Sequence, residues 1–294
     1  MPLELSVFGQ VEKDIATKKY SAALRKLSFL SVENSKNITY LKYLCEVLNG
    51  LGDEEALIKA LKELNRQSPN IELEIEIMRL LYKNAHINEA LDIGLSLQET
   101  NLTLDQKKNL ICILMKIYVE ENDFEGIKEI VEQAGEIVSG NDFMLWADGL
   151  ACLSGQELNQ ALIRFRRAVS INPQNDQVWV SLALVHYDMG DEELAIANLE
   201  KALDCNPLNN AAVKLYSQWV TRGSDKAQRA LSSVQNYLCE HEFDEEISVC
   251  HVQLLCRLQH FSDAQCEVSK LIVTHPQNIN YRQMKKNLEQ NLNM

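Results

Sequence analysis

DFMLWADGLACLSGQELNQALIRFRRAVSINPQN (residues 142–175) is followed directly by DQVWVSLALVHYDMGDEELAIANLEKALDCNPLN (residues 176–209), and the two stretches align at a period of 34 residues. A fixed period of this length indicates one supersecondary unit that repeats along the chain. Each stretch predicts two amphipathic helices with a tight turn near Gly155 or Gly190–Asp191, and a proline that ends the second helix. The aligned pairs are Ala161 with Ala195, Phe165 with Leu199, Ala168 with Ala202, and Pro173 with Pro207.

This pattern resembles the tetratricopeptide repeat. The residues that carry the likeness are Trp179, Leu182, Tyr187, Gly190, Ala195, Ile196, Ala202 and Pro207. The resemblance implies a helical scaffold that binds other proteins along a concave inner face formed mainly by the first helix of each repeat.

The repeat register extends outward in both directions, with repeats starting near residues 4, 38, 71, 108, 142, 176, 210 and 245. Apart from Pro2, every proline (69, 173, 207 and 276) falls on the same repeat position, just past the second helix, where the missing amide costs nothing. We therefore predict an all-α fold: a right-handed α-solenoid of about eight helix-turn-helix repeats and a C-terminal capping helix over residues 279–294.

The register slips by about three residues around residues 101–105. We therefore expect two regions. Residues 1–105 form about three divergent repeats, and residues 106–294 form about five repeats with the capping helix.

The composition excludes some classes of ligand. The formal net charge is −13, and such a balance argues against a nucleic-acid backbone or an anionic membrane as the main ligand, because both require a surplus of Lys and Arg. The N-terminus has no export-signal pattern, and no apolar run approaches the roughly 18 residues of a membrane span. We therefore expect the eight cysteines to be reduced thiols and the protein to be cytoplasmic. The alternative is an export signal that was trimmed from the chain.

The resemblance also implies which first-helix positions line the groove. In repeats five and six these positions are apolar, and we predict a trough that takes an amphipathic helix or an extended apolar segment. In repeats three and four they are polar or cationic. The apolar residues are Phe143, Trp146, Leu150, Leu153, Val180, Leu184 and Tyr187, and the others are Arg79, Tyr82, Lys83 and Lys116.

Alternatives to this trough remain at this point. The helix that starts at Asp142 could be rotated by one residue, so that Trp146 takes a structural position, or a neighbouring part of the chain could fill the trough. Two functional alternatives are self-assembly into a homo-oligomer, with the apolar N-terminal helix of one copy in the trough of another, and a regulatory role within a larger complex.

We expect no catalysis, no metal and no cofactor. Gly50-Leu51-Gly52 is a helix–helix turn rather than a phosphate loop, and the cysteines and histidines between residues 239 and 266 contain no Cys-x-x-Cys pair. No nucleophile has an assignable base or orienting partner.

Overall fold

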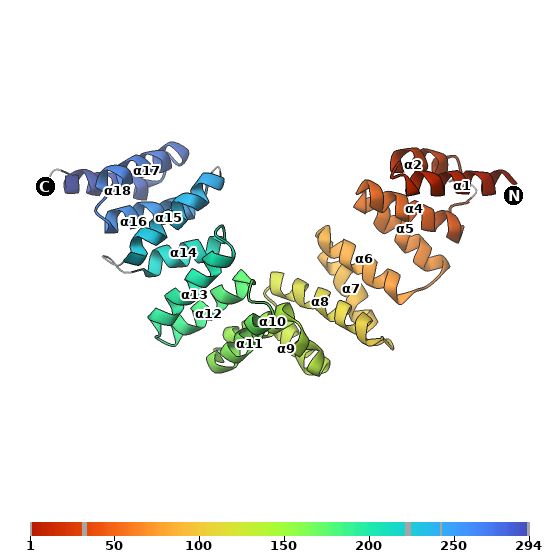
Figure 1. Cartoon of the computed structure of the whole chain (residues 1–294), viewed down its shortest axis with the longest axis horizontal. Helices are drawn as coiled ribbons and strands as arrows, with labels where there is room; N and C mark the ends of the chain where they lie inside the picture. Colours follow the sequence, from red (N-terminus) through yellow and green to blue (C-terminus); the bar gives the residue numbers. More distant parts are fainter. Residues whose placement is uncertain (1, 31–33, 221–224, 242, 293–294) are drawn as a thin grey trace. The chain divides into compact units, whose positions relative to one another are not determined.

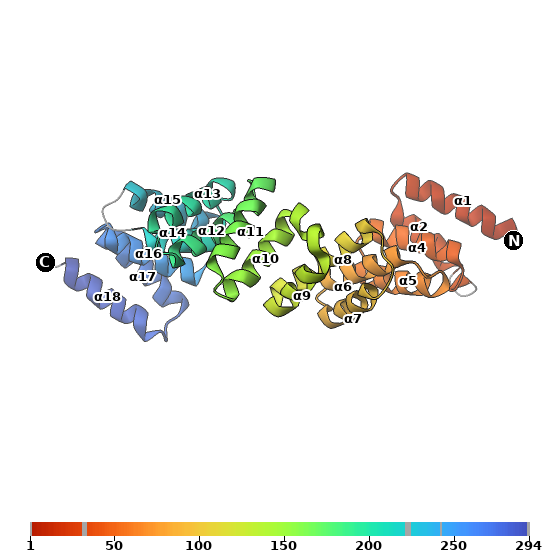
Figure 2. The same ribbon diagram turned by 90° about the horizontal axis from the view of Figure 1, so that it is seen from below.

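The computed structural model describes residues 2–30, 34–220, 225–241 and 243–292, and within these ranges the chain is helical, without a strand. The chain divides into two compact units, Met1–Ala134 and Gly135–Met294. Figures 1 and 2 show the helices of each unit stacked in sequence order. The division predicted after residue 105 rested on the repeat register alone and stays a prediction.

Unit 1 consists of successive helical hairpins. Its helices are α1 (Pro2–Ala16), α2 (Tyr20–Ser28), α4 (Ile38–Leu51), α5 (Glu54–Gln67), α6 (Ile71–Lys83), α7 (Ile87–Gln98), α8 (Leu104–Glu120) and α9 (Phe124–Ala134). Each helix packs against its partner in the hairpin, and successive hairpins pack against each other.

Unit 2 continues the same pattern. Its elements are the 3-10 helix η1 (Gly135–Gly140), α10 (Asp142–Ser154), α11 (Leu158–Ile171), α12 (Asp176–Asp188), α13 (Glu192–Cys205), α14 (Asn210–Trp219), α15 (Asp225–Glu240), α16 (Glu245–Arg257), α17 (Phe261–Thr274) and α18 (Ile279–Leu292). The described residues thus form eight hairpins and a final helix, so the predicted all-α solenoid is confirmed.

Four of the second helices end where the prolines predict. Pro69, Pro173, Pro207 and Pro276 each lie just after the end of α5, α11, α13 or α17. The small residues at which paired helices approach most closely, among them Ala161 and Ala195, are fully buried. Each hairpin therefore keeps its close helix contact, and a proline stops the second helix.

The turns inside the hairpins use a left-handed residue. Its φ is +73° at Gly52 and +82° at Gly190, the two positions where glycine supplies this conformation at little cost. Elsewhere a residue with a Cβ takes it, as Ala85 does with φ +60° and Gln156 with φ +59°. The turn predicted near Gly155 is present, and its left-handed residue is Gln156, because Gly155 has an ordinary φ of −78°.

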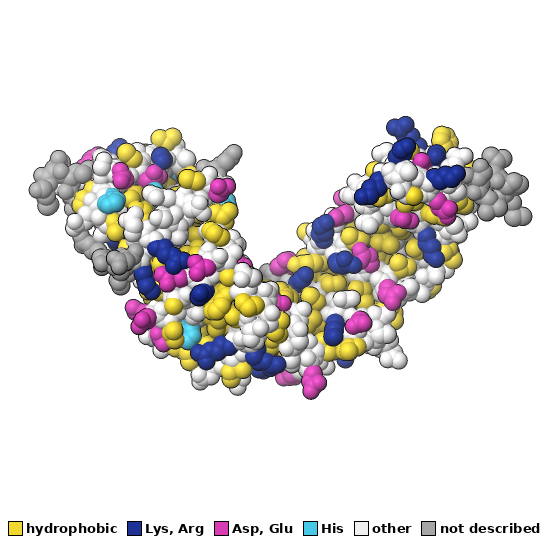
Figure 3. Space-filling model, in the orientation of Figure 1, with side chains coloured by type: hydrophobic (Ala, Val, Ile, Leu, Met, Phe, Trp, Pro, Cys, Tyr) yellow, Lys and Arg dark blue, Asp and Glu magenta, His cyan; other side chains and the backbone are white. Residues whose placement is uncertain are grey.

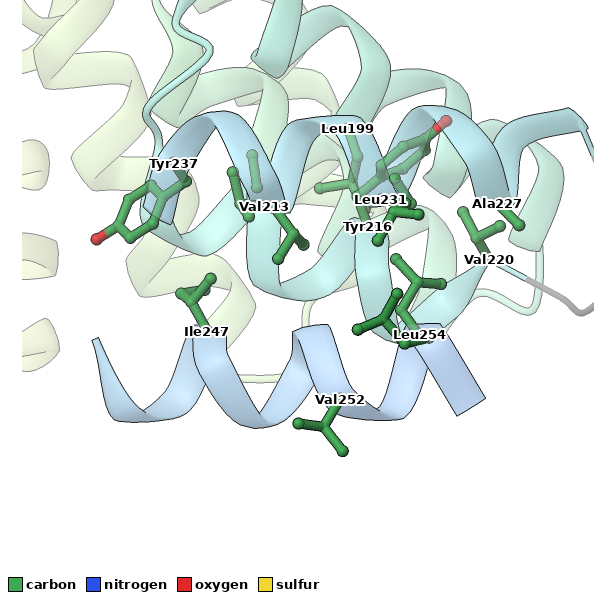
Figure 4. Close-up of a cluster of buried hydrophobic side chains, with 14 of the residues drawn as sticks. Leu199, Val213, Tyr216, Val220, Ala227, Leu231, Tyr237, Ile247, Val252 and Leu254 are labelled. Carbon is green, nitrogen blue, oxygen red and sulfur yellow. The ribbon is translucent and has the colours of Figure 1, made fainter. Parts of the chain in front are cut away.

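The core of unit 2 runs along the stack instead of gathering at one centre. Figure 4 shows Ile247 and Leu254 of α16 directed toward the apolar side chains of α14 and α15, with Val252 on the opposite side of α16. A helix with buried side chains on two sides joins the layer before it to the layer after it. This arrangement is what a repeat array requires, since no single hairpin can bury its own apolar surface.

Candidate functional site

The candidate site is the row of first helices in unit 2: α10, α12, α14 and α16. Each begins after a residue whose side chain caps the helix, and this cap satisfies an amide that the helix leaves free. The caps are Asn141, Asn175, Asn209 and Asp244, and each side chain accepts from the backbone N–H three residues later.

A repeated polar clamp fixes one first helix against the start of the next. Oδ2 of Asp142, the first residue of α10, accepts hydrogen bonds from the side-chain amides of Asn172 at 2.9 Å and Asn175 at 3.0 Å. Because Asn175 is also the cap of α12, the clamp couples the start of α10 to the start of α12. The same clamp recurs one repeat later, where Asp176 accepts from Asn206 and Asn209, both at 2.7 Å.

Helix α10 presents a continuous apolar stripe. Phe143, Trp146, Leu150 and Leu153 follow one another at three- or four-residue spacing, which places them on one face of the helix, and all four are half-buried. The rings of Phe143 and Trp146 lie 5.7 Å apart between centroids. Trp146, Leu150 and Leu153 pack against the buried apolar cluster that contains Phe165.

A hydrogen bond joins the side chain of Trp146 to α12. Its indole N–H donates to the hydroxyl of Ser181 at 2.8 Å. In contrast, the indole of Trp179 donates to the carbonyl of Pro173, before its own helix, at 2.9 Å. Leu145, which lies 34 residues before Trp179, is 1% exposed. The alternative in which α10 is rotated and Trp146 takes the structural position is therefore not adopted.

Helix α12 contributes less exposed surface than expected. Leu184 is half-buried and Tyr187 is 43% exposed, but Val180 is only 5% exposed and packs in the core with Leu199. The prediction that Val180 lines the trough is thus corrected, because Val180 belongs to the buried apolar cluster of unit 2.

Two residues of the site were missed in the sequence. Ser181 holds the indole of Trp146, and Trp219, at the end of α14, stacks on Tyr187 with ring centroids 4.1 Å apart and planes 8° apart. Neither residue lies at a repeat position that the family resemblance assigns to the groove. The only sequence signal for Trp219 is a large aromatic residue at the end of a first helix.

The polar groove residues predicted in repeats three and four belong to unit 1, where Arg79 pairs with Glu76 and Lys83 pairs with Glu54. Exposed ion pairs of this kind contribute little stability. Lys116 is exposed on α8.

Tyr82, the remaining polar groove residue, donates to Glu120 across α6 and α8. Burial and this hydrogen bond raise the pKa of Tyr82 to about 12, so its hydroxyl stays a donor at neutral pH.

Metal binding and membrane crossing are two further functions that the arrangement of side chains would reveal. Across the described ranges, no three His, Cys, Asp or Glu side chains are placed to hold a metal ion. No helix in the same ranges combines the length and the apolar character needed to cross a membrane. None of the eight cysteines, all of which lie in the described ranges, forms a disulfide. Figure 3 shows apolar side chains interspersed among the charged ones on the visible face of each unit.

Comparison with known proteins agrees with this geometry. Residues 176–207 match the family model described as tetratricopeptide repeat. Two solved structures have similar folds: a tetratricopeptide repeat protein from Parabacteroides merdae, with 14% identity over 86% of this chain and 98% of that one at a TM-score of 0.55, and pilF from Pseudomonas aeruginosa, with 14% identity over 74% and 97% at 0.56. Residues 176–207 are thus a tetratricopeptide repeat, and the fold of the chain is that of tetratricopeptide repeat proteins.

A longer curated protein is also similar. The chain is 20% identical over 221 residues to anaphase-promoting complex subunit 3 of Schizosaccharomyces pombe. The match covers 75% of this chain and 33% of the yeast protein, so the chain spans about a third of the length of that relative.

Proposed function

We propose that this protein is a non-enzymatic scaffold whose first helices in unit 2 bind a protein segment. The observation that carries the proposal is the stripe of half-buried apolar side chains along α10, together with Leu184 and the stacked rings of Tyr187 and Trp219 on the first helices that follow. Apolar surface of this kind marks interaction sites, and aromatic residues supply much of the energy of such interfaces. The similar yeast protein is named as the subunit of a complex, which fits a role in protein assembly.

The surface is prepared for binding before a partner arrives. Trp146 is held by its hydrogen bond to Ser181, and Tyr187 is held by its stacking on Trp219. Because these rings already have limited freedom, a partner that packs on them loses less conformational entropy on binding.

The chemistry of the stripe favours an apolar partner. Between Phe143 and Leu153 the only Asp, Glu, Lys, Arg or His is Asp148, which is 6% exposed and pairs with Arg164 at 2.5 Å. The solvent-facing side of α10 therefore offers no free charge. An amphipathic helix or an extended segment with apolar side chains fits this face best, with the interaction driven by the burial of apolar area at about 25 cal/mol per Å².

Eight cysteines without a disulfide are compatible with a reducing compartment, and we propose a cytoplasmic location.

The test compares two double variants in an affinity capture from cell extract. The variant Trp146→Ala with Leu184→Ala removes the stripe. The control Ile163→Ala with Ile171→Ala removes apolar side chains of similar exposure, 49% and 47%, from α11 of the same unit. Circular dichroism establishes that both are folded.

We expect a partner that the native chain and the control retain and that the stripe variant loses. A photo-crosslinker at position 187 should attach to the same partner. If the stripe variant retains every partner, the proposal is wrong.

A further inference from the structure

His251 in unit 2 is a buried side chain whose polar atoms have no hydrogen-bond partner. It lies on α16 and is 7% exposed, and neither ring nitrogen has a hydrogen-bond partner. Among the buried side-chain atoms of the described ranges, these two nitrogens are the ones left in this state. A buried polar group without a partner is costly, so its presence asks for an explanation.

The repeats provide an internal comparison, because His251 is the seventh residue of its first helix. The seventh residue of α10 is Asp148, which pairs with Arg164 at 2.5 Å. The seventh residue of α14 is Tyr216, whose hydroxyl donates to Glu200 at 2.8 Å. The seventh residue of α12 is Leu182, which needs no polar partner.

The position that supplies Arg164 in the α10–α11 hairpin is occupied by Glu267 in the α16–α17 hairpin. The sequence spacing is the same, but the order of base and acid is reversed. The contact is also open: Nδ1 of His251 lies 3.9 Å from Oε2 of Glu267, beyond hydrogen-bond distance. Glu267 is held instead by Lys270, whose Nζ lies 2.7 Å from Oε1.

We propose that His251 makes the α16–α17 hairpin the acid-sensitive element of unit 2, because a proton on its buried imidazole opens the hairpin locally. The neutral ring is tolerated in the core, whereas burial penalises the charged ring, and the nearest carboxylate, Glu267, lies beyond hydrogen-bond distance. The hairpin of α10 and α11 serves as the comparison, because it contains no histidine and its equivalent residue, Asp148, is paired with Arg164.

The charged groups around His251 act in opposite directions, and burial outweighs them. All those that act on it come from α17: Glu267 and Asp263 favour the charged ring, and Lys270 disfavours it. Helices α14 and α15 also pack against α16, and the bases on these two helices pair with other carboxylates: Lys214 with Glu246, Lys226 with Glu200 and Arg229 with Asp204. Burial is the largest influence and lowers the pKa of His251 below its ordinary value of 6.5.

The sign of the pH effect follows from this lowered pKa. Above pH 6.5 the ring is neutral in both the closed and the open hairpin, and the closed state keeps its full stability. Below pH 6.5 the open state binds the proton more readily than the closed state. Opening therefore becomes easier as the pH falls, by up to about tenfold per pH unit for one proton.

The experiment is hydrogen exchange of the full chain between pH 7.5 and 5, corrected for the intrinsic pH dependence of exchange. We expect the protection of peptides from α16 and α17 to fall by up to about tenfold per pH unit below pH 6.5, while peptides from α10 and α11 keep theirs. The variant His251→Leu, which installs the residue type of Leu182, should abolish the difference. The control His260→Gln changes an exposed histidine and should behave like the native chain.

Titration of the His251 ring by NMR in the native chain decides the matter without any variant. A pKa below 6.5 is expected, and a pKa at or above 6.5 would overturn the proposal. The proposal also fails if His251→Leu opens with the same pH dependence as the native chain. Neither result bears on partner binding, because the experiment contains no partner.

Discussion

The indole N–H of Trp146 donates to the hydroxyl of Ser181 at 2.8 Å, and this hydrogen bond joins the first helices of two successive hairpins. Ser181 in turn donates to the carbonyl of Gln177 at 2.9 Å within α12. The hydroxyl is therefore used both as an acceptor and as a donor. A small polar residue in a buried position thus aims a large aromatic residue at the edge of the proposed binding surface.

Replacement of Ser181 by Ala should loosen this link. The change leaves the indole N–H of Trp146 without its acceptor, and we expect a loss of about 1 kcal/mol in the free energy of unfolding. Urea denaturation followed by circular dichroism measures the loss. The control Ser170→Ala removes an exposed hydroxyl that bonds only to the carbonyl of Arg167 in its own helix, and it should be nearly neutral. Equal losses in the two variants would contradict the link.

The clamp at Asp142 predicts a pH dependence at the acid end. Burial alone would raise the pKa of this carboxyl, but hydrogen bonds from Asn175, Asn172 and backbone amides outweigh burial and lower the pKa below its ordinary value of 3.8. A depressed folded-state pKa contributes stability that is present above pH 3.8 and is lost as the pH falls through the folded value.

The variant Asp142→Asn should therefore flatten the stability profile below pH 3.8 relative to the native chain. Urea denaturation at a series of pH values between 2 and 5 provides the comparison. The exposed Asp188 is the matched control, and Asp188→Asn should leave this part of the profile unchanged. A native profile in Asp142→Asn would rule out the clamp as its source.

The left-handed residue between α6 and α7 predicts a stabilising substitution. Ala85 has φ +60°, a conformation that costs a residue with a Cβ roughly 1–2 kcal/mol. Glycine avoids this cost but loses more entropy on folding, so Ala85→Gly should stabilise unit 1 by about 0.5–1 kcal/mol. The control Ala197→Gly lies within α13 and should destabilise by about 1 kcal/mol. Thermal unfolding should show shifts of opposite sign.

The repeat architecture could be predicted from sequence because its signals are local and periodic. Prolines stop the second helices, and alanines such as Ala161 and Ala195 mark the closest helix contacts at a fixed spacing. These features depend on the chemistry of single residues, and every repeat confirms the register of the others.

The site could be predicted only in part, since exposure depends on the neighbouring hairpin. Val180 occupies a groove position in the repeat, yet it is buried in an apolar cluster that spans several hairpins. Trp219 lies off the expected positions, yet it completes the aromatic pair with Tyr187. The pattern of a single repeat predicts which positions lie on the groove face of the helix. Contacts between repeats decide which of these side chains stay exposed.

The close packing of α10 on α11 predicts that Gly149 cannot carry a side chain. A Cβ at this position would lie 2.4 Å from the ring of Phe165, which is fully buried and has no room to move. Overpacking of this kind costs about 1–3 kcal/mol, and the better helix propensity of alanine recovers about 1 kcal/mol. We therefore expect Gly149→Ala to destabilise unit 2 by about 1 kcal/mol in urea denaturation. Gly9 lies in α1, where an added Cβ would meet nothing within 4 Å, so Gly9→Ala should stabilise, and the same sign for both variants would contradict the close approach.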